Sequence, residues 1–122
     1  MKKEDIIYMA GFFDGEGHIR FNNNIIKRQN TKDSISYSIV IRIVNTNLPL
    51  LEHLKEIWGG HIYHRKIKGG RYKNAHDLVI SNKDSVKKFI ELVYPYSFIK
   101  KEQIDRALDS YKLVRGYDYF DI

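Results

Sequence analysis

Two acidic residues, Asp14 and Glu16, lie in a short segment whose other members are glycine, alanine, methionine and phenylalanine. Carboxylate oxygens suit Mg²⁺, which commonly takes only one or two protein carboxylates beside water and phosphate. A carboxylate in the last turn of a helix is unfavourable for the helix dipole. We therefore expect Glu16, at the end of the first predicted helix, to hold a positively charged group such as a metal ion.

Three glycines, Gly11, Gly15 and Gly17, accompany these acids, although a glycine inside a helix costs about 1 kcal/mol relative to alanine. Gly11 and Gly15 lie one helical turn apart, so one face of the helix carries almost no side-chain volume. Such a face lets a second backbone approach closely. Gly17 by itself indicates only a common glycine cap at the end of a helix.

The segment from Met9 to Gly17 resembles the signature motif of the LAGLIDADG family of homing endonucleases, because its apolar, small and acidic positions match without a gap. The resemblance implies that Glu16, where the family more often has Asp, binds the metal ion with help from the backbone carbonyl of Gly15. It implies a structural role for Asp14. The implied cofactor is Mg²⁺, with Mn²⁺ or Ca²⁺ able to substitute for binding.

A second segment, Pro95 to Gln103, resembles the part of these endonucleases that carries a basic active-site residue before the last helix. Lys100 aligns with that lysine, and Lys101 is the competing choice. A lysine there would polarise the water network or stabilise charge on the phosphoryl group. Asn45, at the end of a predicted strand, is the candidate for the water-positioning Gln or Asn of the family. Lys100, Asn45 and Glu16 are therefore the expected catalytic residues.

Hydrophobic periodicity supplies the elements that position these residues. Helical spacing predicts four helices, over residues 4–15, 48–58, 83–93 and 98–114. Alternating spacing predicts two hairpins, whose strands lie near residues 18–22 and 36–45, and near 61–66 and 71–81. This α-β-β-α-β-β-α-α order indicates an α+β domain. The LAGLIDADG resemblance implies the same order over a single domain, 1–122, with a saddle-shaped antiparallel sheet and helices on one face.

Alternate positions along these strands carry polar and basic side chains on the face opposite the core, where an ordinary solvated sheet face is the alternative reading. Arg, Asn and Ser hydrogen-bond base edges, whereas Lys suits phosphates. A two-stranded ribbon is narrow enough to enter a major groove. The predicted DNA-binding residues are Arg20, Asn22, Asn24, Lys27, Arg28, Lys32, Ser36, Ser38, Val40, Arg42, His61, Tyr63, Arg65, Lys66, Lys68, Arg71, Lys73 and Asp77.

The chain carries one copy of the motif. Single-motif relatives are homodimers, and two-fold symmetry fits two identical Glu16 residues around one interface. The expected substrate is therefore a long, near-palindromic DNA duplex of which each protomer cuts one strand. The predicted dimer contacts are Met9, Ala10, Gly11, Phe12, Asp14 and Gly15.

The 122 residues have a formal net charge of +6 and include no cysteine. The charge favours an anionic partner, and the absence of cysteine excludes disulfides and thiolate metal sites. No apolar run reaches the length of a membrane span, and the first residues lack the long apolar region of a secretory signal. We expect an intracellular protein, cytoplasmic or organellar, that is not secreted and has no membrane partner.

Three functional hypotheses follow. The first is a sequence-specific, Mg²⁺-dependent double-stranded DNA endonuclease that acts as a homodimer. The second is a non-cleaving protein on the same scaffold, either a maturase that binds intron RNA or a DNA-binding regulator. The third is an unrelated basic α+β protein in which the glycine-rich helix only packs a core.

Overall fold

The computed structural model describes residues 1–27, 29, 32, 34–65 and 74–121. A short 3₁₀ turn, η1 (Tyr94–Tyr96), precedes the last helix. The other elements, in chain order, are α1 (Lys3–Glu16), β1 (Gly17–Ile26), β2 (Ser34–Asn45), α2 (Leu48–Trp58), β3 (His61–Arg65), β4 (Ala75–Ile80), α3 (Lys83–Val93) and α4 (Lys101–Arg115). The α+β class and the predicted order of elements are confirmed.

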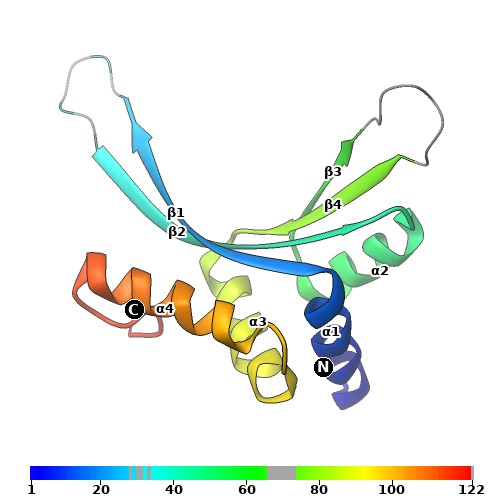
Figure 1. Cartoon of the computed structure of the whole chain (residues 1–122). Coiled ribbons are helices and arrows are strands. Elements are labelled where there is room, and N and C mark those ends of the chain that lie inside the picture. Colours follow the sequence, from blue (N-terminus) through cyan, green and yellow to red (C-terminus); the bar gives the residue numbers. More distant parts are fainter. Residues whose placement is uncertain (28, 30–31, 33, 66–73, 122) are drawn as a thin grey trace.

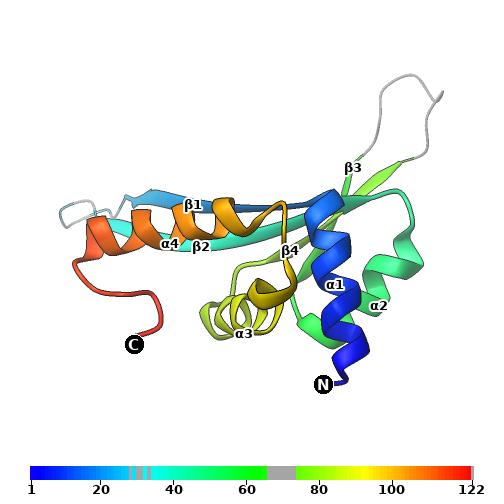
Figure 2. The same ribbon diagram turned by 60° about the horizontal axis from the view of Figure 1, so that its bottom comes forward.

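The four described strands form one antiparallel sheet in the order β1-β2-β4-β3. Both hairpins curve away from the helices, which gives the sheet its saddle shape and leaves one face open (Figure 1). The helices lie together beneath the other face (Figure 2). The sheet therefore separates a covered apolar face from an open polar face, as the alternation of residues predicts.

The covered face of the sheet consists of aliphatic residues in alternate positions. Ile39, Ile41 and Ile43 of β2 have no exposed surface, and they belong to one core with residues from every helix. Phe89 of α3 packs edge-on against Phe13 and Trp58, with ring centroids 5.1 and 5.3 Å apart. The alternation predicted for β2 is confirmed.

The bounds of two helices follow from local capping. The side-chain oxygen of Asn47 accepts a hydrogen bond from the backbone N–H of Leu50 at 3.1 Å, and α2 begins there. Asn82 caps α3 in the same way, accepting from Ser85 at 3.2 Å. Helix α2 ends at Gly59, whose φ of +80° favours glycine. Both helices have the predicted residue ranges.

The last helix begins later than predicted. The sequence pattern places its start at residue 98, but α4 begins at Lys101. The preceding residues are hydrogen-bonded to Asp14 of α1 and do not adopt a helical turn. A contact distant in sequence therefore sets this boundary.

Candidate active site and DNA-binding surface

The centre of the candidate active site is the carboxylate of Asp14, near the end of α1. It accepts hydrogen bonds from the Ser97 hydroxyl, from the backbone N–H of Phe98 at 2.8 Å and from that of Lys100 at 3.1 Å. Partial burial acts to raise the pKa of Asp14, but these hydrogen bonds outweigh it and lower the pKa below the ordinary carboxyl value. We call these contacts the Asp14 clamp.

The Asp14 clamp brings Lys100 to the end of the helix that carries Glu16. The competing residue, Lys101, points elsewhere, because its ammonium nitrogen lies 5.0 Å from the centre of the Tyr94 ring. This geometry is a cation–π contact. Lys100 occupies the N-cap position of α4 without a side-chain cap, and of the two lysines it is the one whose backbone N–H is tied to the end of α1.

Glu16 itself is exposed, and it makes no hydrogen bond or ion pair with any residue that the structure describes. A carboxylate without protein partners suits a metal ligand, because both of its oxygens are available. Within the described part of the chain, no three His, Asp or Glu side chains are grouped to hold a metal ion. A Mg²⁺ ion at Glu16 would therefore need water, phosphate or a second subunit to complete its oxygen ligands.

The side chain of Asn45 makes a local hydrogen bond at the end of β2. Its side-chain oxygen accepts a hydrogen bond from the backbone N–H of Asn47 at 2.8 Å, in the turn between β2 and α2. By alternation along β2, its side chain belongs to the same face as Ile43, which is covered by helices. This contact engages the side-chain oxygen and leaves the N–H₂ donors of Asn45 available, so the water-positioning role stays a prediction.

The open face of the sheet collects the polar residues predicted to bind DNA. Strand register places Arg20 opposite Val40, Asn22 opposite Ser38, Asn24 opposite Ser36, and Arg65 opposite Ala75, and residues directly opposite each other point to the same face. At its centre is a hollow of about 290 Å³ lined by His18, Arg20, Asn22, Val40, Arg42 and Arg65. This concentration of cationic groups is suited to an anionic partner.

The remaining predicted DNA contacts lie around this hollow or outside the described residues. His61 and Tyr63 are exposed on β3, with their rings in contact at a centroid distance of 4.6 Å. Lys27 and Lys32 are exposed beyond the ends of β1 and β2. Five predicted residues lie outside the part of the chain that the structure describes: Arg28, Lys66, Lys68, Arg71 and Lys73.

Asp77 corrects one of the predictions. Its side chain is buried, 2% exposed, because β4 lies between β2 and β3 and the long side chains of both neighbours cover it. One carboxylate oxygen accepts hydrogen bonds from Arg42 and from Arg65, each at 2.7 Å. Asp77 therefore orients two arginines of the open face and does not itself face a ligand.

His18 is a member of the open face that the sequence analysis did not include. It lines the central hollow and lies opposite Arg42 in the strand register. Alternation with Arg20 and Asn22 was the signal that could have identified it, since β1 begins at Gly17, immediately after the motif helix. The histidine therefore lies close in sequence to Glu16 and on the open face of the sheet.

The glycines of α1 differ in what the folded chain requires of them. A Cβ atom at Gly17 would lie 2.1 Å from the Phe13 ring, so this position needs glycine. Gly11 and Gly15 are exposed, and a Cβ atom on either would meet nothing within 4 Å. The isolated subunit therefore gives no steric reason for glycine at these two positions.

Two of the predicted dimer contacts are buried within the subunit. Met9 and Ala10 are 0% and 1% exposed and belong to its own core, so the prediction that they face a partner does not fit their burial. Asp14 is occupied by the clamp. The face available to a partner is thus formed by Gly11, Gly15 and the half-buried Phe12, whose ring stacks on Tyr8 at a centroid distance of 6.0 Å.

The chain belongs to the LAGLIDADG endonuclease family, whose model matches residues 9–108. The match begins at Met9, the first residue of the motif, and includes both the Asp14 clamp and the four strands. The hypothesis of an unrelated basic α+β protein is therefore excluded. No curated protein matches the chain.

Solved structures show the same fold. An archaeal intron-encoded homing endonuclease complexed with DNA has 23% identity and a TM-score of 0.64, over 95% of this chain and 72% of that chain. The homing endonuclease I-CvuI, in complex with its target in the presence of 2 mM Ca, has 21% identity and a TM-score of 0.64, over 93% and 69%. The group I intron-encoded endonuclease I-CeuI, complexed with DNA, has 20% identity and a TM-score of 0.61, over 93% and 55%.

One further expectation concerns membranes. Among the described residues, no helix combines the length and the hydropathy that a bilayer span requires.

The Asp14 clamp predicts a pH-dependent stability difference between wild type and Asp14→Asn. Because the pKa of Asp14 lies below its ordinary value of 3.8, the clamp stabilises the fold above that value, and its contribution is lost as the pH falls through the lowered pKa. Asp14→Asn should lower the free energy of unfolding by about 1–3 kcal/mol at neutral pH. Urea denaturation at about pH 7 and pH 2.5 should show this gap closing in acid. As a control, Asp118→Asn changes an exposed acid and should lower the free energy of unfolding only slightly. If the difference in stability between wild type and Asp14→Asn were the same at both pH values, an ionised Asp14 would not be what stabilises the clamp.

Replacing the buried Asp77 should lower the stability of the fold and release two arginine side chains from their fixed positions. Asp77→Ala removes the acceptor of two ion pairs, but the arginine side chains are 42% and 52% exposed and can turn to water. The expected cost is therefore about 1–3 kcal/mol, below that of a fully buried pair. Urea denaturation measures it, with Asp109→Ala as the control that removes an exposed acid of α4. Equal stability of wild type and Asp77→Ala would show that the ion pairs do not support the fold.

Proposed function

We propose that this protein is a sequence-specific double-stranded DNA endonuclease, which cuts as a homodimer with Mg²⁺ bound at Glu16. The observation that carries the proposal is the exposed, unpartnered carboxylate of Glu16 beside the Asp14 clamp and next to the basic open face. Membership of an endonuclease family supports the reaction class. The DNA in the complexes of I-CvuI and I-CeuI supports the substrate class.

The open face is the proposed DNA-binding surface. Two hairpins curve away from the helices on this side of the sheet (Figure 1), and a two-stranded ribbon can enter the major groove. Arg20, Arg42 and Arg65 present guanidinium groups suited to guanine edges. Ion pairing with Asp77 fixes two of them, so their direction is set before DNA binds. Fixed donors favour specificity, because they do not adjust to the wrong base.

The active-site residues have separate tasks in the proposed hydrolysis. Glu16 would hold the ion, with the backbone carbonyl of Gly15 in the same turn as a second ligand. When bound, Mg²⁺ activates water and neutralises charge on the phosphoryl oxygens. The ammonium group of Lys100 stabilises negative charge on the phosphate as the bond to the leaving oxygen breaks. The Asp14 clamp keeps the lysine beside the acid throughout.

A second copy of the chain is the proposed source of the remaining metal ligands. Gly11 and Gly15 leave open space along α1, and a two-fold contact there brings two α1 helices together. Glu16 of each copy then lies near the axis, where one ion or more can be shared. The corresponding DNA site is long and near-palindromic, with one strand cut by each protomer.

The decisive experiment for this function is a cleavage selection on a randomised DNA library. Wild type with Mg²⁺ or Mn²⁺ should enrich a family of cut sequences, and a chelator should abolish cutting. Glu16→Gln should still bind the selected duplex but lose cutting by at least about 100-fold, because the amide holds the ion poorly. Glu91→Gln, the same exchange on the exposed face of α3, should cut like wild type. A library with no cut member, or full activity in Glu16→Gln, would refute the function or its mechanism, respectively.

The proposed dimer is tested by filling the glycine face. The double variant Gly11→Ala with Gly15→Ala should weaken dimerisation, because two methyl groups separate the helices. The isolated subunit should gain up to about 1 kcal/mol per site from helix propensity. Sedimentation equilibrium gives the dissociation constant of the dimer. Urea denaturation, at a concentration where wild type is monomeric, gives the free energy of unfolding of the subunit. A double variant that dimerises as tightly as wild type would place the interface elsewhere.

A further inference from the structure

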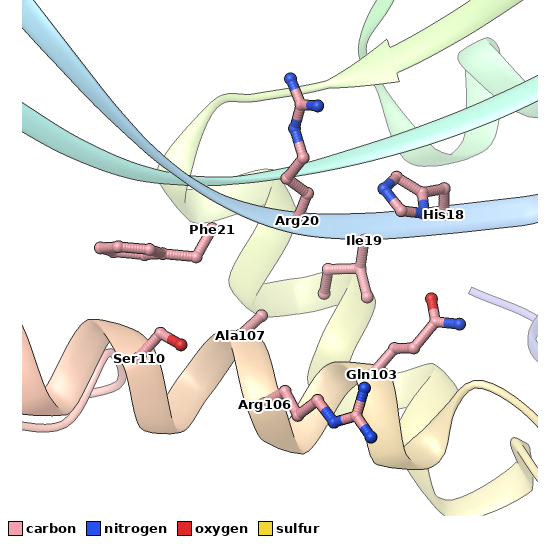
Figure 3. A pocket seen from close by; sticks show the side chains of 8 residues that line it. All are labelled: His18, Ile19, Arg20, Phe21, Gln103, Arg106, Ala107 and Ser110. Atoms are coloured by element: carbon pink, nitrogen blue, oxygen red, sulfur yellow. The ribbon is translucent and has the colours of Figure 1, made fainter.

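A groove between the edge strand β1 and helix α4 remains unexplained by the proposed active site. It has a volume of about 480 Å³ and is open to solvent. Its polar side chains are His18 and Arg20 of β1 and Gln103, Arg106 and Ser110 of α4. In Figure 3, Gln103 extends from α4 toward β1 and His18, whereas Arg20 rises toward the open face of the sheet. The groove therefore continues from the open face around the edge of the sheet.

The polar groups of this groove favour an anion. Two guanidinium groups, an imidazole, an amide and a hydroxyl all supply hydrogen-bond donors. Arg106 is paired only with Glu102 at 2.6 Å, among the described residues, and these side chains are 73% and 74% exposed. An exposed pair of this kind contributes little, so Arg106 is free to exchange its partner for a phosphate.

Gln103 adds a second, independent observation. Its side-chain oxygen is buried and has no hydrogen-bond partner in the described part of the chain. A buried carbonyl without a donor costs about 1–3 kcal/mol. The amide group of Gln103 therefore keeps unused hydrogen-bonding capacity beside the groove, and its N–H₂ donors suit an anion.

The position of the groove indicates which anion enters it. A sheet lying in the major groove of DNA has a phosphate backbone along each edge, and β1 is one edge of this sheet. The hollow beside the other edge strand, β3, has two carboxylates, those of Glu52 and Glu56, against a single lysine, Lys55, with His61 and His64 as its further polar side chains. Of these two hollows, the one beside β1 therefore has the positive charge that suits a DNA phosphate backbone.

We propose that the groove between β1 and α4 holds the phosphodiester backbone of one DNA strand, with Arg106 of α4 as a phosphate contact. This inference rests on the proposed function, since it assumes that duplex DNA lies on the open face. It extends the DNA-binding surface from the sheet to the flank of α4. Contacts of this kind position DNA and carry no sequence information.

The test is the salt dependence of DNA binding. Fluorescence anisotropy with a labelled duplex of mixed sequence gives the slope of log K against log salt concentration, which changes by about 0.9 for each phosphate contact. Arg106→Gln should make the slope shallower by about 0.9, and by the same amount on a second duplex of different sequence. Lys88→Gln removes the same charge from an exposed position of α3 and should keep the wild-type slope. Thermal denaturation checks that both variants fold.

The outcomes separate this inference from the proposed function. If wild type does not bind duplex DNA, the proposed function itself fails. If wild type binds and Arg106→Gln keeps its slope, only the groove contact is refuted. If Lys88→Gln made the salt slope shallower by the same amount, the effect would come from net charge, and the contact would also be refuted. A slope change seen with an RNA duplex but not with DNA would overturn the choice of partner.

Discussion

The arrangement of the candidate site depends on one carboxylate, that of Asp14. It joins the end of α1 to the segment before α4 through a side-chain hydroxyl and two backbone N–H groups. One of these N–H groups is that of Lys100, so the contacts tie the backbone of this lysine to the turn that carries Glu16. A structural hydrogen-bond network thus brings together two candidate site residues that are far apart in sequence.

Environment, not residue type, divides the acids of this protein into supports and a candidate ligand. Asp14 accepts hydrogen bonds at both carboxylate oxygens, one of them from the backbone N–H of Lys100. One oxygen of Asp77 accepts from Arg42 and Arg65. Glu16 lies only two residues from Asp14 yet has no partner among the described residues. An acid whose hydrogen bonds hold a basic residue thus occurs both in the candidate active site and at the centre of the open face.

Sequence reasoning succeeded where the determinants are local. The ranges of α2 and α3 follow from Asn47, Asn82 and a terminal glycine, each acting within a few residues. The start of α4 was misplaced because a residue of α1 sets it. Alternation assigned Asp77 to the correct face, but it cannot report that two neighbouring strands cover that position. Met9 and Ala10 were wrongly predicted to contact a partner. Apolar residues lie on most sides of this helix, so their spacing alone does not show which side packs against the subunit's own core.

Two deficiencies of the isolated subunit have one common explanation. Gly11 and Gly15 lower the helix propensity of α1, although the space around them is open. Glu16, at the end of the same helix, belongs to no group of three described His, Asp or Glu side chains that could hold a metal ion. In the proposed dimer, the helix that packs against the glycines is a copy of α1, and it brings its own Glu16 to the same end. The open glycine face and the incomplete ligand set would therefore both be completed by the symmetric dimer that we propose.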